Sequence, residues 1–119
     1  MDFKQFNELL DKIKLSKELM EMNNEIFNLR KYLNTLLVIK DRFNKGDITK
    51  GVNISLEPLN KKYGTNFKCE KDEEFVVVLT NMIKYIDEKG VQILNKKIED
   101  EIIKKLMNYW KSGILEKIT

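Results

Sequence analysis

The sequence of 119 residues contains no histidine and a single cysteine, Cys69, and these two absences exclude much of the chemistry of small enzymes. Without histidine, one chain can form no Ser-His-Asp triad, no Cys-His dyad and no histidine-bound zinc site. Without a second cysteine it can form no intrachain disulfide and no Cys-x-x-Cys pair. We therefore expect no catalytic activity, no metal, no cofactor and no small-molecule substrate.

Alanine is absent as well, and only two of the 22 cationic residues are arginine, Arg30 and Arg42. Because alanine is the best helix former, its absence has no structural reason and indicates AT-rich codon usage. We expect the chain to come from a low-GC bacterium, or from a phage or mobile element that lives in one.

Long apolar runs are also missing. The longest, residues 75–79 and 36–39, fall far short of the roughly 20 apolar residues that a membrane-spanning helix needs. The N-terminus lacks the basic-then-apolar pattern of a signal peptide. These features predict a cytoplasmic protein that is not inserted in a membrane.

Apolar residues recur at intervals of three and four along most of the chain, which predicts helices. We expect helices over 3–14, 17–44, 73–89 and 91–111, together with a short helix that ends at Gly64. Asp2, Ser16 and Asp72 are predicted N-caps, and Gly46, Gly90 and Gly113 are predicted stops. The expected fold is all-α, a single domain over 1–119 built as a bundle of four or five helices.

The middle of the chain is less regular. Val52, Ile54 and Leu56 alternate with polar residues, as in an edge strand, and Phe67 and Cys69 are candidates for a second strand. A short β-hairpin within residues 50–70 is therefore an alternative to an irregular helical connection.

Several apolar side chains fall outside the main stripes of the predicted helices. A helix in a simple bundle needs one apolar stripe, so a second stripe must be covered by another helix or by a partner. The partner-binding candidates are Met20, Phe27, Val38, Ile103, Met107 and Trp110, and the apolar tail Ile114, Leu115 and Ile118 adds to them. The alternative is that a central helix buries both faces, or that the tail folds back over this patch.

Residues 40–71 carry eight cations and four anions, with aromatic residues among them. Cations neutralise phosphates and aromatic rings stack on bases, so this segment is a candidate contact for nucleic acid or for an acidic partner. The candidate residues are Lys40, Arg42, Lys45, Lys61, Lys62, Tyr63 and Lys68. The alternative is a solvated lysine-rich surface, since the net charge is only +3.

Two further features favour structural roles. The acidic cluster Glu70, Asp72, Glu73 and Glu74 is better explained by helix capping than by metal binding, because no second acidic motif completes a site. Cys69 has neighbouring lysines but no histidine to serve as a base, so we expect a partly buried structural thiol.

These observations predict a non-catalytic protein–protein interaction module, such as an adaptor, inhibitor, immunity protein or small subunit of a complex. It would bind a second copy of itself or another protein. The alternative is a small basic protein associated with nucleic acid, for instance an inhibitor of a host nucleoprotein or nuclease that is encoded by a phage or mobile element.

Overall fold

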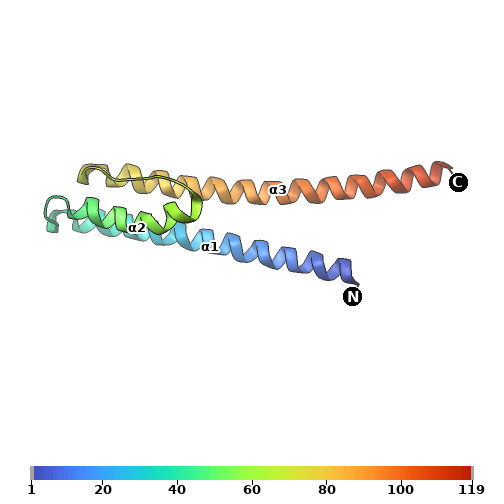
Figure 1. The fold of residues 1–119 in the computed structure, drawn as a ribbon, viewed down its shortest axis with the longest axis horizontal. Helices are drawn as coiled ribbons and strands as arrows, with labels where there is room; N and C mark the ends of the chain where they lie inside the picture. The colour runs from blue at the N-terminus through green and yellow to red at the C-terminus, as the bar shows by residue number, and fades with distance from the viewer. Residues whose placement is uncertain (1, 119) are drawn as a thin grey trace. The chain divides into compact units, whose positions relative to one another are not determined.

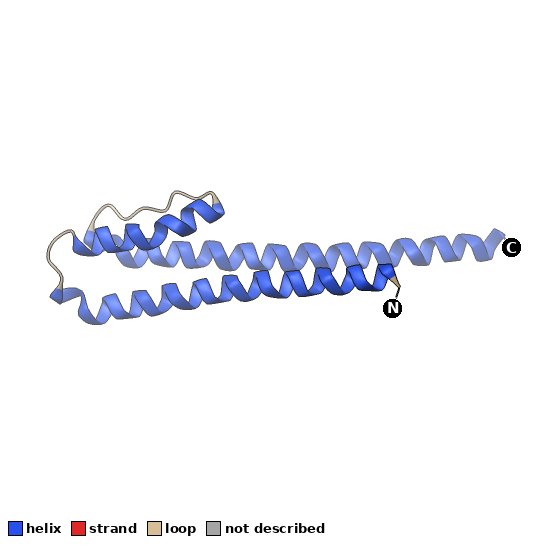
Figure 2. Ribbon diagram, turned by 60° about the horizontal axis from the view of Figure 1, so that its bottom comes forward, coloured by secondary structure: helices blue, strands red, loops and turns tan. Residues whose placement is uncertain are grey.

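The computed structural model describes the backbone of residues 2–118 and the side chains of residues 2–110. Its elements in chain order are α1 (Phe3–Ile39), the 3-10 helix η1 (Lys40–Arg42), α2 (Asp47–Tyr63), the 3-10 helix η2 (Asp72–Glu74) and α3 (Phe75–Ile118) (Figure 1). Within the described residues, helices are joined by loops and no strand is present (Figure 2). The all-α class is confirmed, whereas the four- or five-helix bundle is not, because three long helices take its place.

The chain divides into two units, Met1–Asp87 and Glu88–Thr119. The first unit contains α1, α2 and the beginning of α3, and the second contains the rest of α3. Every described side chain that is apolar and buried belongs to the first unit. The expected single domain over 1–119 stays a prediction.

Helix α1 replaces two predicted helices. Its N-cap is Asp2, as expected, because the Asp2 carboxylate accepts a hydrogen bond of 2.8 Å from the backbone N–H of Gln5. Ser16 does not cap a second helix: its hydroxyl donates to the carbonyl oxygen of Lys12, one turn earlier. Since no proline or glycine lies between residues 3 and 39, nothing interrupts the backbone hydrogen bonds and one helix continues.

Helix α3 likewise joins the predicted helices 73–89 and 91–111, and it continues past Gly113 to Ile118. Gly90, predicted as a stop, lies inside it. An interior glycine costs about 1 kcal/mol relative to alanine but keeps its N–H, so it weakens a helix without ending it.

Helix α2 occupies most of the segment for which a hairpin was the alternative. Ile48, Val52 and Leu56 are buried, whereas Ile54 is 60% exposed. The spacing of four places the three buried residues on one helical face. The alternation of Val52, Ile54 and Leu56 covers too few residues to distinguish the period of a strand from that of a helix. Gly64 ends the helix, as predicted, in a left-handed conformation with φ 66°.

The core of the first unit lies between α1, α2 and the first turns of α3 (Figure 1). Each helix contributes apolar side chains at intervals of three or four, and Cys69 adds one from the loop before η2. The buried residues are Met22, Ile26, Leu29 and Leu36 from α1, Ile48, Val52 and Leu56 from α2, and Phe75, Leu79, Met82, Ile83 and Ile86 from α3. Full burial of each such side chain contributes roughly 1.5–3 kcal/mol.

Candidate functional site

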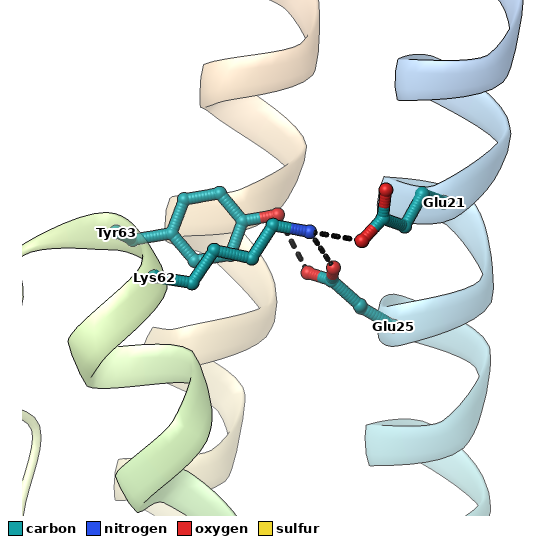
Figure 3. Close-up of polar contacts among 4 residues, drawn as sticks. All are labelled: Glu21, Glu25, Lys62 and Tyr63. Carbon is teal, nitrogen blue, oxygen red and sulfur yellow. Dashed lines mark hydrogen bonds and ion pairs between the residues drawn. The ribbon is translucent and has the colours of Figure 1, made fainter.

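A polar cluster ties the C-terminal end of α2 to α1 (Figure 3). The Lys62 ammonium lies 2.6 Å from a carboxylate oxygen of Glu21 and also forms an ion pair with Glu25. The Tyr63 hydroxyl donates a 2.5 Å hydrogen bond to the other carboxylate oxygen of Glu25. Glu25 therefore accepts from both side chains at once and holds the end of α2 in register with α1.

This cluster keeps both of its α2 side chains protonated. The hydrogen bonds to Glu21 and Glu25 raise the pKa of Lys62. Burial, followed by the hydrogen bond to Glu25, raises the pKa of the Tyr63 phenol. Neither group can act as a base near neutral pH, so the arrangement serves packing. Lys62 and Tyr63 are candidates for a nucleic-acid contact, which stays a prediction; in the structure both side chains bind Glu25, and Lys62 remains partly exposed.

Aromatic packing supports the same end of α2. The Tyr63 and Phe67 rings both pack edge-on against Tyr85 of α3, with centroid separations of 6.0 and 5.9 Å. Two aromatic residues of the predicted basic segment are thus packed within the first unit, whereas the third, Phe43, is exposed.

The remaining basic candidates fall into two groups. Lys40, Arg42 and Lys45 lie at the junction of α1 and α2, and Lys61 and Lys68 lie near the opposite end of α2. About 14 residues of helix, roughly 21 Å, separate the two groups. All five are exposed, but the structure does not gather them into one stripe.

The segment between Thr65 and Cys69 is fixed by asparagine side chains of α2 rather than by a second strand. The Asn53 amide donates to the carbonyl of Cys69 and accepts from its N–H. The Asn60 amide makes the same pair of bonds with the backbone of Phe67 and also accepts from the Thr65 hydroxyl. Each amide supplies the donor and acceptor that a neighbouring strand would otherwise provide.

Cys69 is held in this segment as a structural thiol. Its side chain is completely buried, and its Sγ donates to the carbonyl oxygen of Lys71. Burial raises the pKa of the thiol, which disfavours the thiolate form that a nucleophile or a metal ligand requires.

Asp72 caps a helix, but not the one that the sequence predicts. Its carboxylate accepts from the backbone N–H groups of Gly46 and Thr49 and from the Thr49 hydroxyl, so it caps the N-terminus of α2 from 23–26 residues away. These hydrogen bonds, the hydroxyl first, lower the pKa of Asp72. Among the described residues, no group of three or more acidic or cysteine side chains is placed to hold a metal ion.

All six apolar partner-binding candidates are exposed: Met20, Phe27 and Val38 on α1, and Ile103, Met107 and Trp110 on α3. Phe27 and Val38 lie near the two ends of a shallow, open groove on the outer side of α1, and all the residues that line it belong to α1. Arg30 and Lys31 line this groove, which also includes Asn34, Thr35 and Ile39. The predicted tail residues Ile114, Leu115 and Ile118 lie outside the described side chains.

The sequence did not predict two features of the exposed surface of α1. Arg30 and Lys31 lie inside a predicted core helix, although residues 26–40 contain no acidic residue that would neutralise them. The predicted helix 3–14 has an apolar stripe of Phe3, Phe6, Leu10 and Ile13, which a helix bundle would bury, and the structure leaves this stripe exposed. An α-helix turns about 100° per residue, so this stripe lies roughly 135° around α1 from the core stripe. The change in the direction of the apolar side chains near Leu15 is the feature of the sequence that could have shown that the first stripe does not face the core.

No helix within residues 2–118 contains a segment that is both apolar enough and long enough to span a membrane. Comparisons of the chain with protein-family models, with curated proteins and with solved structures found no match.

Proposed function

We propose that this chain is a non-catalytic protein-interaction module that docks through exposed apolar faces of its helices. The observation that carries the proposal is the set of exposed apolar side chains that the core leaves uncovered. They lie on the face of α1 opposite Met22, Ile26 and Leu29, and on both helices beyond the ends of the core. Large exposed apolar surfaces on helices are typical of protein-docking sites.

The groove on α1 is the best-defined of these faces. It combines the apolar side chains of Phe27 and Val38 with the cationic Arg30 and Lys31. Such a face suits a helix or loop whose apolar side chains are bordered by acidic ones, because the cations would steer and orient it. The polar cluster of Glu21, Glu25, Lys62 and Tyr63 supports the module by keeping α1 rigid beside the groove.

The same proposal assigns the chain a cytoplasmic role as an adaptor, inhibitor, immunity protein or small complex subunit. A low-GC bacterium, or a phage or mobile element within one, is the source that the composition favours. We do not advance the nucleic-acid alternative as a second function, since Lys62 and Tyr63 are already engaged with Glu25.

Photo-crosslinking in the cells of origin tests the proposal. A photoreactive amino acid at position 27 or 38 should yield a discrete protein adduct that survives nuclease treatment. The same amino acid at position 54 or 77 should not, although Ile54 and Val77 are 60% and 61% exposed outside this groove and Phe27 is 64% exposed within it. Adducts of equal yield at all four positions, no adduct at any, or adducts that nuclease removes would overturn the proposal.

The double substitution Met107→Ala with Trp110→Ala provides a separate test of the face on α3. Both side chains are more than half exposed, so the unfolding midpoint should stay within the small range typical of surface changes. Binding of the protein that docks on this face of α3 should weaken at least about tenfold, since Trp and Met are typical interface anchors. Loss of the folded state would place these residues in a core instead.

A further inference from the structure

A second regular row of side chains runs along the outer side of α1. Its members recur at alternating intervals of four and three residues from Phe6 to Val38, and all of them are exposed. We call this set the outer row. Its apolar members are Phe6, Leu10, Ile13, Met20, Phe27 and Val38.

Alternating intervals of four and three are the repeat with which helices pack in left-handed coiled coils. On a straight helix such a row drifts by about 20° every seven residues, and the supercoiling of the paired helices removes this drift. The core row of α1 has the same repeat, because Met22, Ile26, Leu29 and Leu36 each lie two positions after a member of the outer row. Two positions correspond to about 200° around the helix. A course of α1 that keeps the core row facing inward therefore keeps the outer row facing outward over the same stretch.

We propose that the outer row pairs with a helix of a partner protein in a left-handed coiled coil, and that this helix carries acidic side chains where it faces Lys17 and Lys31. These two lysines are members of the row, and neither forms an ion pair within the described part of the chain. Between residues 13 and 38, the only acidic side chain directly beside the row is Glu21, which is already bound to Lys62. The opposite charge for both lysines must therefore come from the partner.

A second copy of the chain does not supply this charge. Its outer row brings the same two lysines and no carboxylate, so in either orientation Lys17 and Lys31 would be covered without a partner of opposite charge, which is costly. An anionic membrane fits less well than a helix. Helices that lie on membranes carry their cations on the polar face, whereas Lys17 and Lys31 interrupt the apolar row in its middle. At such a position within a coiled coil, a lysine selects the partner and its register.

The groove on α1 is the C-terminal part of the outer row, because Phe27, Lys31, Asn34 and Val38 belong to both. The inference rests on the proposed function and deepens it by naming the kind of partner. That partner is an amphipathic helix whose apolar stripe is interrupted by acidic residues.

Binding of labelled synthetic peptides to the full chain tests the pairing. The acidic probe is a helical peptide of about four heptads with Leu at every core position except two, which carry Glu and face Lys17 and Lys31 in parallel alignment. A second acidic probe places the two Glu residues for antiparallel alignment, and each has a basic counterpart with Lys at the same positions. By fluorescence anisotropy, the wild-type chain should bind one acidic probe in the micromolar range and its basic counterpart at least about tenfold more weakly.

The double substitution Lys17→Glu with Lys31→Glu should reverse this preference, so that the basic probe binds at least about tenfold more tightly than the acidic one. Loss of helical structure in the variant would weaken both probes alike, so a reversal assigns the effect to the contact between the helices. Lys12→Glu with Lys50→Glu is the matched control. It changes the net charge by the same amount at exposed positions outside the outer row and should keep the wild-type preference.

The pairing would be overturned by a chain that binds none of the probes, by equal binding of acidic and basic probes, or by a variant that does not reverse the preference. Binding to phosphatidylglycerol vesicles or to poly-uridine RNA without a preference among the peptides would also overturn it, in favour of a membrane or a nucleic acid. These outcomes are independent of the crosslinks at positions 27 and 38. A protein adduct without charge-dependent peptide binding would contradict only the pairing, and peptide binding without an adduct in cells would contradict only the proposed function.

Discussion

Single side chains hold the irregular part of the first unit in place, and they do so over distances that local sequence patterns do not reveal. Asn53 and Asn60 bind backbone that is 16 and 7 residues further along the chain. In the sequence they are two polar residues among many asparagines, and nothing near them marks a binding role. The alternating apolar pattern at Phe67 and Cys69 predicted an extended segment but could not show that amides, rather than a strand, complete its hydrogen bonds.

Asp72 gives the clearest prediction for a single residue. Its pKa is lowered in the folded state, so its carboxylate stabilises the fold above the unfolded-state pKa of about 3.9 and this contribution is lost as the pH falls through the lower folded-state pKa. Asp72→Asn should therefore lower the midpoint of thermal unfolding at pH 7. The difference from wild type should shrink and disappear as the pH is lowered below about 3.9.

Glu70→Gln is the matched control, because it removes a nearby exposed carboxylate and should leave the midpoint unchanged. A difference between Asp72→Asn and wild type that persists unchanged at low pH would show that the charge of Asp72 is not what caps α2.

Helix α1 shows why apolar stripes can be predicted from residue spacing, whereas the ends of the helices that carry them cannot. Each stripe was identified from its spacing, and the core stripe through Met22, Ile26 and Leu29 is buried as expected. The two stripes were attributed to two helices, because Ser16 between them was predicted to cap the second helix. The structure resolves them as opposite sides of one helix, because backbone continuity depends on breakers and none is present.

Helices α1 and α2 lie close together at Gly51, and this closeness is testable. A Cβ at position 51 would lie only 2.9 Å from the Tyr32 hydroxyl oxygen. Gly→Ala in an unhindered helix stabilises by about 1 kcal/mol, and here the hydroxyl must first move. We expect Gly51→Ala to stabilise the chain more, by roughly 1 kcal/mol, when Tyr32→Phe is also present.

Denaturant unfolding of the wild type, both single variants and the double variant measures this coupling directly. Additive free energies of unfolding would mean that Tyr32 moves aside without cost and that the two helices are not closely packed at this point.

For the whole molecule, composition and periodicity were sufficient to predict the all-α class and the apolar side chains left over on α1 and α3. They were not sufficient to predict where the core ends. Placing Phe3, Phe6 and Leu10 inside a bundle assumed that a chain of this length buries most of its apolar stripes. The structure buries only the middle of the sequence, because α2 is too short to cover more of α1.

The position of the core leads to a prediction about truncation. All described buried side chains lie between Met22 and Ile86, so a chain of residues 1–87 should unfold cooperatively with a free energy within about 1 kcal/mol of the full chain. A chain of residues 1–74, which lacks Phe75, Leu79 and Met82, should not fold. Circular dichroism during denaturant unfolding distinguishes the two. Failure of the 1–87 chain to fold would show instead that residues beyond 87 complete the core.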